Sequence, residues 1–276
     1  MVARYGAHAD VLPLKENPEQ KVYRCNLRTH LDSLVTGDLV VWRAAEPDGG
    51  VITASSERIS EFSRPDTRGK LRPIAANIDQ VFVVFAPKPL TPSGLLDRYL
   101  VALETLNLKP ILLLNKSDLI AQKSNSEVSR LLKIYRDLGY PLIETSTKTE
   151  AGLNELITSL AGRTSVFVGQ SGVGKSSLIN ALLPEADIRT GELSAATGKG
   201  THTTTTTLMF QLQHGGKVID SPGIREFGLW HINKQQLAEG FIEFRPYLGK
   251  CRFRDCSHLT EPGCAIRAAY AAGLIA

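Results

Sequence analysis

A glycine-rich segment, residues 165–177 with the sequence SVFVGQSGVGKSS, carries side chains suited to binding phosphate. It has the spacing G-x-x-x-x-G-K-S, with Gly169, Gly174, Lys175 and Ser176 at the fixed positions. Glycines let consecutive backbone N–H groups turn toward one anion, and the lysine and serine add an ammonium and a hydroxyl that can reach phosphates and Mg²⁺. The pattern therefore predicts a phosphate-binding loop.

The flanking sequence is what such a loop requires. The apolar run Val166–Val168 precedes it and predicts a buried strand, whereas 177–183 has the spacing of a helix, whose N-terminus would add partial positive charge. We expect Lys175 to reach the β- and γ-phosphates and to take part in catalysis. The residues expected to surround the phosphates are Gly169, Gln170, Ser171, Gly172, Val173, Gly174, Lys175, Ser176 and Ser177.

A second polar cluster, Asn115-Lys116-Ser117-Asp118, follows another buried apolar run. A carboxylate at Asp118 can accept hydrogen bonds from the N1–H and N2 amine of guanine, a donor pair that adenine lacks. The Asn115 amide can address the acceptor edge of the purine, and the stem of Lys116 can lie across the ring. The cluster predicts GTP and GDP as ligands rather than ATP. A second loop around the base is expected after the next strand, at Ser146 and Thr147.

Two further segments have the groups needed to hold Mg²⁺ and to sense the γ-phosphate. In Asp220-Ser-Pro-Gly223, which follows a short apolar run, the aspartate can bind Mg²⁺ through water and the Gly223 N–H can bond the γ-phosphate. The threonine-rich segment 190–207 is typical of a switch loop that orders on Mg²⁺. The sequence does not choose among the candidate Mg²⁺ ligands of this segment, Thr203, Thr204 and Thr205. We take Thr204 as the working assignment, with Ser176 of the phosphate loop as the other side-chain ligand of Mg²⁺.

Hydrolysis needs a group that orients water. Many GTPases place a glutamine directly after the D-x-x-G glycine, and this chain has Ile224 there, which predicts slow unassisted hydrolysis. His202, in the threonine-rich segment, is the nearest polar replacement and is our candidate catalytic residue. The alternative is an inert, solvent-exposed histidine.

Three thiols and an imidazole lie close together near the C-terminal end, with the spacing C-x4-C-x-H-x5-C: Cys251, Cys256, His258 and Cys264. They would fill a tetrahedral shell, which predicts one structural Zn²⁺ per chain. The spacing favours a metal site in a reducing cytoplasm over a disulfide framework, and the isolated Cys25 is expected to be buried. Nearby basic side chains suit contact with RNA backbone: Lys250, Arg252, Arg254 and Arg267.

Composition and pattern divide the 276 residues into three parts. Residues 1–75 have short apolar alternations between turns, which predict an all-β, OB-type barrel that binds RNA. Residues 76–228 alternate strands and helices, as in an α/β doubly wound sheet, and residues 229–276 hold the metal ligands. The basic stretch 64–72 either contacts RNA phosphates or is a solvated linker.

The net charge of +4 permits a nucleic-acid partner without requiring one. The N-terminal residues lack the apolar run of a signal peptide, and no apolar run approaches the length of a membrane span. We therefore expect no membrane partner, and we expect a monomer.

The order of the motifs is unusual. The guanine-reading loops come first, the phosphate loop follows, and the γ-phosphate loop comes last, whereas the common GTPase layout begins with the phosphate loop. This order predicts a circularly permuted GTPase. It also joins the γ-phosphate loop directly to the C-terminal region, so nucleotide state can pass straight to that region.

The chain resembles one bacterial family, the ribosome small-subunit-dependent GTPase A family. The resemblance covers nearly the whole chain and rests on the motif order and on the following segments: Thr36-Gly-Asp, Ala75-Ala-Asn-Ile-Asp-Gln, Gly200-Thr-His-Thr-Thr, Asp220–Trp230 (DSPGIREFGLW) and Cys251–Cys264. It implies an N-terminal OB fold, a permuted GTPase and a zinc domain. In that family a switch-loop histidine proposed to be catalytic corresponds to His202. The chain ends at Ala276, where the resemblance leads us to expect a further helix.

The same resemblance implies that the protein binds the small (30S) ribosomal subunit and its 16S rRNA late in assembly. The subunit would stimulate GTP hydrolysis, and hydrolysis would release the protein. The alternative is a nucleotide-gated rRNA-binding module in which turnover is incidental, because the water-orienting glutamine is missing. A P-loop kinase or ATPase is the other alternative, and the guanine-reading cluster argues against it.

Overall fold

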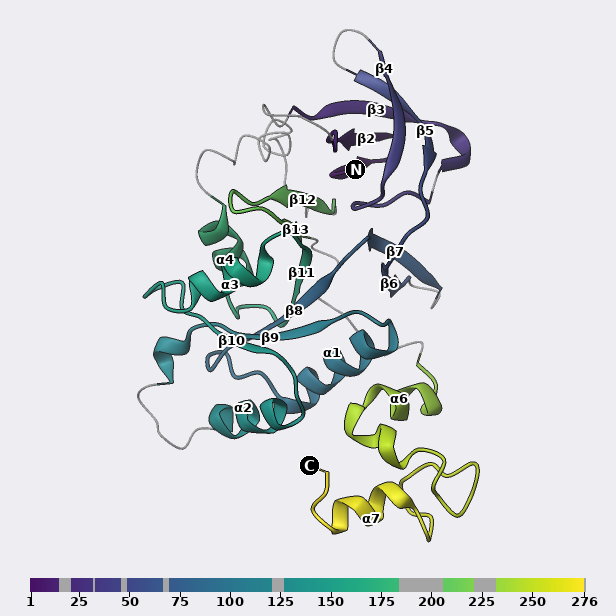
Figure 1. Ribbon diagram of the computed structural model, residues 1–276, viewed down its shortest axis with the longest axis vertical. Helices are drawn as coiled ribbons and strands as arrows, with labels where there is room; N and C mark the ends of the chain where they lie inside the picture. Colours follow the sequence, from purple (N-terminus) through teal and green to yellow (C-terminus); the bar gives the residue numbers. More distant parts are fainter. Residues whose placement is uncertain are drawn as a thin grey trace.

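The computed structural model describes residues 1–14, 21–31, 33–45, 49–66, 70–120, 127–183, 206–220 and 232–275. Figure 1 shows the N-terminal strands at one end, a sheet with helices on both faces in the middle, and a small C-terminal body at the other end. No helix in these segments has the length and apolar character needed to cross a bilayer.

The central part of the sheet consists of five parallel strands and the antiparallel strand β12, in the order β10-β9-β8-β11-β13-β12. These strands are β8 (Gln80–Phe85), β9 (Pro110–Leu114), β10 (Leu142–Glu144), β11 (Thr164–Val168), β12 (Leu208–Gln211) and β13 (Lys217–Asp220). The near-continuous apolar runs of β8, β9 and β11 reflect burial on both faces, which is typical of parallel sheets.

Helices cover both faces of this sheet. Helices α1 (Ser93–Thr105) and α2 (Glu127–Asp137) pack with Val81, Val83 and Phe85, whereas α3 (Leu153–Leu160) and α4 (Lys175–Leu182) pack with Phe82 and Val84. Alternate residues of β8 thus serve opposite layers, as the period of a strand requires. The predicted doubly wound α/β architecture is confirmed.

The N-terminal strands surround a separate apolar cluster that includes Val11, Ile52 and the fully buried Cys25. They are β1 (Ala3–Tyr5), β2 (His8–Val11), β3 (Tyr23–Leu27), β4 (Val40–Ala45) and β5 (Gly49–Ser55), with the short 3₁₀ helix η1 (Thr29–Leu31) after β3. The order β1-β2-β3-β5-β4 is no simple meander and is consistent with a partly open, five-stranded OB fold. Strand β1 also pairs with β12 at Ala3 and Leu208, so the central sheet continues into these strands.

The basic stretch 64–72 lies within a hairpin whose described part is residues 61–66 and 70–76, and Lys70, Leu71 and Arg72 in it are exposed to solvent. Strands β6 (Glu61–Pro65) and β7 (Leu71–Ala76) pair in a separate two-stranded sheet, with Arg64 opposite Arg72. Asp66 accepts hydrogen bonds from the Arg72 side chain (3.1 Å) and the Lys70 main chain (3.0 Å). Whether the hairpin contacts RNA stays a prediction.

The C-terminal body contains α6 (Lys234–Gly240), the 3₁₀ helix η5 (Ile242–Tyr247) and α7 (Ala265–Ala271). It rests on α1, where Arg245 forms an ion pair with Glu104 at 2.6 Å and Gly240 lies against Val101. Burial raises the pKa values of Asp97 and Glu243 at this contact, and the Tyr135 hydroxyl donates to Asp97 at 2.8 Å. The body is therefore packed on the central domain by buried and paired groups.

Gly37 lies at the joint between the N-terminal strands and the central domain. Its φ is 98°, and a Cβ atom there would lie 2.0 Å from the Ala76 carbonyl oxygen. The neighbouring Thr36 hydroxyl donates to the Thr207 carbonyl at 2.8 Å, just before β12. Asp38 is almost fully buried and is held by Arg58 at 2.8 Å. Only glycine fits this close approach.

Gly37→Ala is expected to lower the free energy of unfolding by about 2–4 kcal/mol, because it combines a left-handed backbone with a steric clash. Gly139→Ala is the matched control, since Gly139 also has a positive φ (87°) but has open space around its Cβ position. Gly139→Ala should lower the free energy of unfolding by only about 1–2 kcal/mol, the cost of the left-handed backbone alone. Urea unfolding of both variants measures the difference, and equal losses would contradict the clash.

Candidate functional site

The predicted phosphate loop lies between β11 and α4, at the carboxyl end of the parallel strands. Gly169 and Gly174 have φ values of 145° and 95°, and added Cβ atoms would lie 2.2 Å from a main-chain oxygen and 2.3 Å from Asn115 Nδ2, respectively. The Lys175 ammonium donates to the Gly169 and Gln170 carbonyls at 2.6 and 2.7 Å. It therefore lies within the curve of the loop, where phosphate oxygens can replace those carbonyls.

Asn115 and Lys116 connect the second predicted motif to this loop. The fully buried Asn115 donates through Nδ2 to the Val173 carbonyl at 2.9 Å. Lys116, in the left-handed region with φ 60°, donates through Nζ to the carbonyls of Gly172 and Lys88, each at 2.8 Å. Two side-chain hydrogen bonds thus join the base-reading segment to the phosphate loop, and a third joins it to Lys88.

The two predicted base-reading loops also meet. The Ser146 hydroxyl donates to Asp118 Oδ1 at 2.6 Å, and the Ser117 main chain donates to the Thr145 carbonyl at 3.0 Å. The carboxylate of Asp118 therefore has a fixed direction, and its remaining acceptor positions can take the paired donors of guanine. Asp118 and Ser117 belong to the 3₁₀ helix η2 (Ser117–Leu119), directly after β9, and Thr147 follows β10.

Two buried acceptors at this site lack partners among the residues that the structure describes: Asn115 Oδ1 and Gln170 Oε1. Buried polar oxygens without a donor are costly, so each favours a ligand or water that supplies one. Together with the loop N–H groups, the ammonium of Lys175 and the carboxylate of Asp118, they make a donor and acceptor set that fits a guanine nucleotide.

The remaining predicted residues fall into two groups. Ser176 and Ser177 lie in the first turn of α4, and Asp220 ends β13 opposite Leu208 of β12, so these residues share the carboxyl edge with the phosphate loop. Ligands of open α/β sheets bind at this edge. Three others, His202, Thr204 and Gly223, lie outside the described residues. The structure therefore does not place the predicted catalytic histidine, the switch-loop threonine or the γ-phosphate glycine.

The four predicted metal ligands come together in the C-terminal body. Ligand atoms of Cys251, Cys256, His258 and Cys264 all lie within 4.8 Å of one another. His258 Nδ1 is 3.6 Å from Cys251 Sγ and 3.5 Å from Cys264 Sγ, and these two sulfurs are 4.0 Å apart. Metal–ligand bonds of about 2.0–2.3 Å in a tetrahedron require ligand separations of roughly 3.3–3.8 Å. The two His258–sulfur distances lie in this range and the sulfur–sulfur distance of 4.0 Å is slightly longer, so a small inward shift of the ligands would give the size of a structural zinc site.

The loop that carries His258 is shaped by Glu261. Its carboxylate accepts hydrogen bonds from the Ser257 main chain (2.9 Å) and hydroxyl and from the main chains of Leu259 and Thr260, both at 3.1 Å. These bonds lower the pKa of Glu261 to about 2, with the Ser257 side chain as the largest cause. His258 itself has φ 63°, and the Glu261 contacts hold that conformation.

Sequence reasoning missed two contributors to these sites. Lys88 acts through its carbonyl, and a carbonyl contact leaves no side-chain signal in the sequence. Glu261 lies between the metal ligands, where only its spacing from Ser257 hinted at a loop acceptor. Both position functional side chains without being part of a recognised motif.

Comparison with known proteins agrees with this geometry. Residues 55–230 match the model of the RsgA GTPase family. The chain is 53% identical over 275 residues to the small ribosomal subunit biogenesis GTPase RsgA of Ectopseudomonas mendocina, covering all of this chain and 80% of the relative. The protein of the same name from Hahella chejuensis is 52% identical over the same length, which is 79% of that protein.

Two crystal structures share the fold. YjeQ from Thermotoga maritima superposes with a TM-score of 0.79 at 32% identity, covering 100% of this chain and 91% of the other. YloQ, described as a circularly permuted GTPase, superposes with a TM-score of 0.75 at 31% identity, covering 99% of this chain and 88% of the other. The predicted permuted fold is confirmed.

Lys116→Met is expected to weaken GDP binding at least tenfold, because it removes two hydrogen bonds from a charged donor, one to Gly172 of the phosphate loop and one to Lys88. The Asn115 bond to Val173 remains as a link between the two loops. Lys133→Met, at an exposed lysine of α2, is the control and should leave the affinity unchanged. Fluorescence titration with labelled GDP makes the measurement. An unaltered affinity in Lys116→Met would show that the connection does not organise the site.

Proposed function

Because this chain belongs to the RsgA GTPase family, we propose that it hydrolyses GTP and acts in late maturation of the small ribosomal subunit. The observation that carries the proposal is the connection of Asn115 and Lys116 to the phosphate loop. It sets a guanine-reading carboxylate and a phosphate cradle in one site, as a GTPase needs.

Each residue at the site has a proposed part in binding GTP. Asp118 accepts from the guanine edge, while Asn115, Lys116, Ser117, Ser146 and Thr147 shape the base pocket. The main chain of residues 169–174, with Lys175 and Ser177, surrounds the phosphates. Ser176 and Thr204 ligate Mg²⁺, Asp220 holds it through water, and Gly223 contacts the γ-phosphate.

The proposed catalytic groups are Lys175, which neutralises charge on the phosphates, and His202, which takes over the water-orienting role absent at Ile224. With Ile224 in place of a water-orienting glutamine, we expect slow unassisted hydrolysis, and a slow basal rate suits an enzyme that a partner activates. The small subunit would complete the active site, and hydrolysis would release the protein from it.

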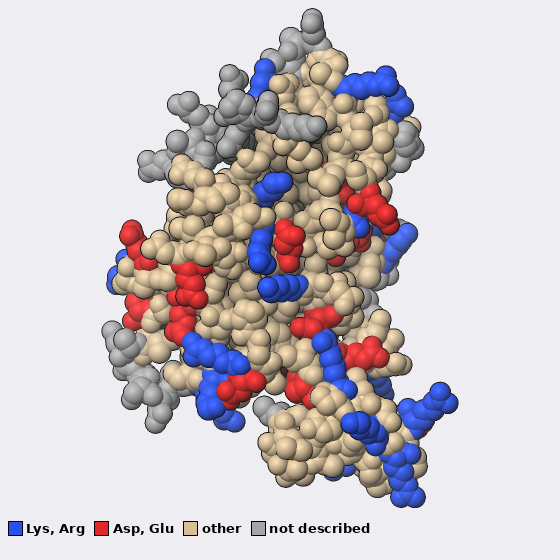
Figure 2. Space-filling view, in the orientation of Figure 1, with Lys and Arg blue, Asp and Glu red and all other residues tan. Residues whose placement is uncertain are grey.

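The three proposed parts of the chain have separate tasks. Residues 1–75 form the OB-fold barrel and contact RNA, residues 76–228 form the permuted GTPase, and residues 229–276 form the zinc-binding domain. One structural Zn²⁺ per chain fits the closed Cys₃His shell, which leaves no open position for chemistry. Basic residues gather over the C-terminal body (Figure 2), which supports contact with 16S rRNA. We propose that the protein works as a cytoplasmic monomer.

A nucleotide-gated rRNA-binding module is the second candidate. The observation in its favour is Ile224, which cannot orient water. In that case the subunit would bind the GTP form without accelerating hydrolysis.

GTP turnover by the full chain should rise strongly with purified small subunits, and ATP should give no comparable turnover. His202→Ala is expected to lower the stimulated rate roughly a hundredfold, the usual worth of an acid–base or water-orienting group, with GTP affinity nearly unchanged. Phosphate release and equilibrium binding provide the two readouts. A wild-type stimulated rate in His202→Ala would exclude the histidine, and subunit binding without stimulation would favour the gated module.

A further inference from the structure

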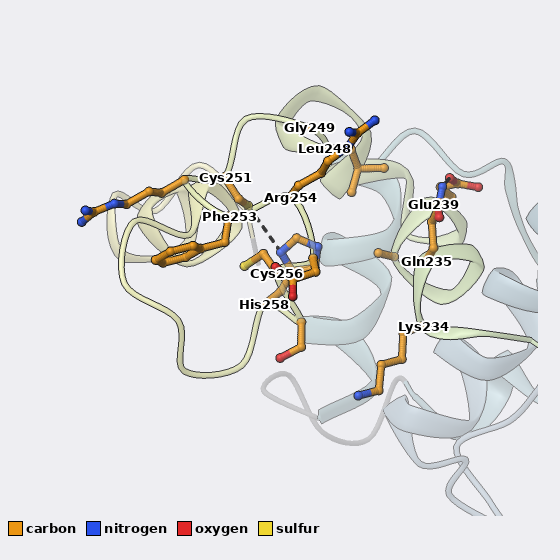
Figure 3. A pocket seen from close by; sticks show the side chains of 14 residues that line it. Lys234, Gln235, Glu239, Leu248, Gly249, Cys251, Phe253, Arg254, Cys256 and His258 are labelled. Atoms are coloured by element: carbon orange, nitrogen blue, oxygen red, sulfur yellow. Dashed lines mark hydrogen bonds between the residues drawn. The ribbon is translucent and has the colours of Figure 1, made fainter.

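A cleft of about 750 Å³ lies between α6 and the metal-binding loop of the C-terminal body. Lys234, Gln235 and Glu239 line it from α6, and residues 251–258 line it from the loop (Figure 3). Its volume is within the range of roughly 300–1,000 Å³ found for small-molecule pockets. It lies in the C-terminal body, outside the proposed nucleotide site on the central sheet.

His258 has one ring nitrogen for the metal and one for the cleft. Nδ1 faces the sulfurs of Cys251 and Cys264, while the second nitrogen is turned toward the α6 side of the cleft (Figure 3). When Nδ1 ligates a metal, Nε2 carries the proton and acts as a donor. Among the hydrogen bonds between described residues, none uses this second nitrogen.

The charges around the cleft are of both signs. Lys234, Arg252 and Arg254 supply exposed cations, and Glu239 and Asp255 supply exposed carboxylates. Glu239 Oε1 accepts from Gln235 at 2.9 Å, which fixes the carboxylate on the α6 wall. A bare phosphate ion would meet the cations but also be repelled by the two acids. An RNA nucleotide offers both a phosphate that accepts and a 2′-hydroxyl and base amines that donate.

We propose that this cleft binds one unpaired nucleotide of ribosomal RNA. The Nε2–H of His258 would donate to one of the two phosphates that flank this nucleotide, and its ribose or base would donate to Glu239. Lys234 and Arg254 lie on opposite sides of His258 (Figure 3), so each would meet a different phosphate of the strand. His258 then has two roles, as a metal ligand and as a phosphate donor. The proposal rests on the proposed function, since it identifies where the C-terminal body meets rRNA.

Equilibrium binding of the full chain to purified small subunits, with a non-hydrolysable GTP analogue and at several salt concentrations, tests the cleft. Lys234→Gln and Arg254→Gln should each weaken binding about fivefold. Each should also lower the slope of log affinity against log salt by about 0.7, the contribution of one phosphate contact on a single strand. Lys250→Gln removes the same charge from the same body outside the cleft, and its effect should be clearly smaller.

His258→Cys separates the two roles of the histidine. Four thiolates still make a closed zinc shell, so zinc content should stay at one per chain while the Nε2–H is lost. The change lowers the net charge by one unit, as Lys250→Gln does, so a greater loss of subunit binding in His258→Cys reports the position of the donor. A short single-stranded uridine RNA should show the same order of variants.

Three results would overturn the proposal. The first is equal affinity of wild type, Lys234→Gln and zinc-loaded His258→Cys for subunits. The second is an equal effect of Lys250→Gln, which would reduce the cleft to general surface charge. The third is lost subunit binding with unchanged RNA binding, which would assign the cleft to a ribosomal protein. Subunit-stimulated GTP turnover of the wild type, measured in parallel, tests the proposed function separately.

Discussion

The hydrogen bonds from Asn115 and Lys116 to the main chain of the phosphate loop hold this site together. Nucleotide recognition requires that a base-reading carboxylate and a phosphate cradle keep one fixed separation. Here the two come from segments in the reverse of the usual order along the chain. Because the bonds depend on where the strands lie in the sheet and not on which comes first, circular permutation leaves the site intact.

The permuted order of the motifs also determines which parts of the chain connect directly to the nucleotide site. The threonine-rich segment leads directly into β12, and β12 pairs with β1 of the N-terminal strands, with Thr36 bonded to Thr207 beside it. The segment after Asp220 leads into the C-terminal body, which packs on α1 through Arg245 and Gly240. Each flanking body is therefore joined to the central sheet next to a segment expected to respond to the γ-phosphate.

Much of this could be predicted from the sequence, because the motifs combine rare residue types with fixed spacing. The phosphate loop, the Asn115–Asp118 cluster and the Cys₃His ligands each lie where the pattern indicated, and buried runs such as 80–85 became strands. The hairpin 61–76 and the pairing of β1 with β12 were not predicted, since both depend on backbone contacts between distant segments. The Lys88 carbonyl was missed for the same reason, because it meets Lys116 only in the folded chain. Glu261 was missed although its contacts with Ser257, Leu259 and Thr260 are local, because no known motif marks them.

Calorimetric titration of the nucleotide-free full chain with GDP and with ADP, both in the presence of Mg²⁺, tests most directly that Asp118 and the phosphate loop form one guanine-nucleotide site. A site that pairs the Asp118 carboxylate, oriented by Ser146, with the guanine donors should bind GDP at least about a hundredfold more tightly than ADP. Equal affinities would show that the phosphate loop works without the Asn115–Asp118 cluster, and would contradict the site that this geometry supports.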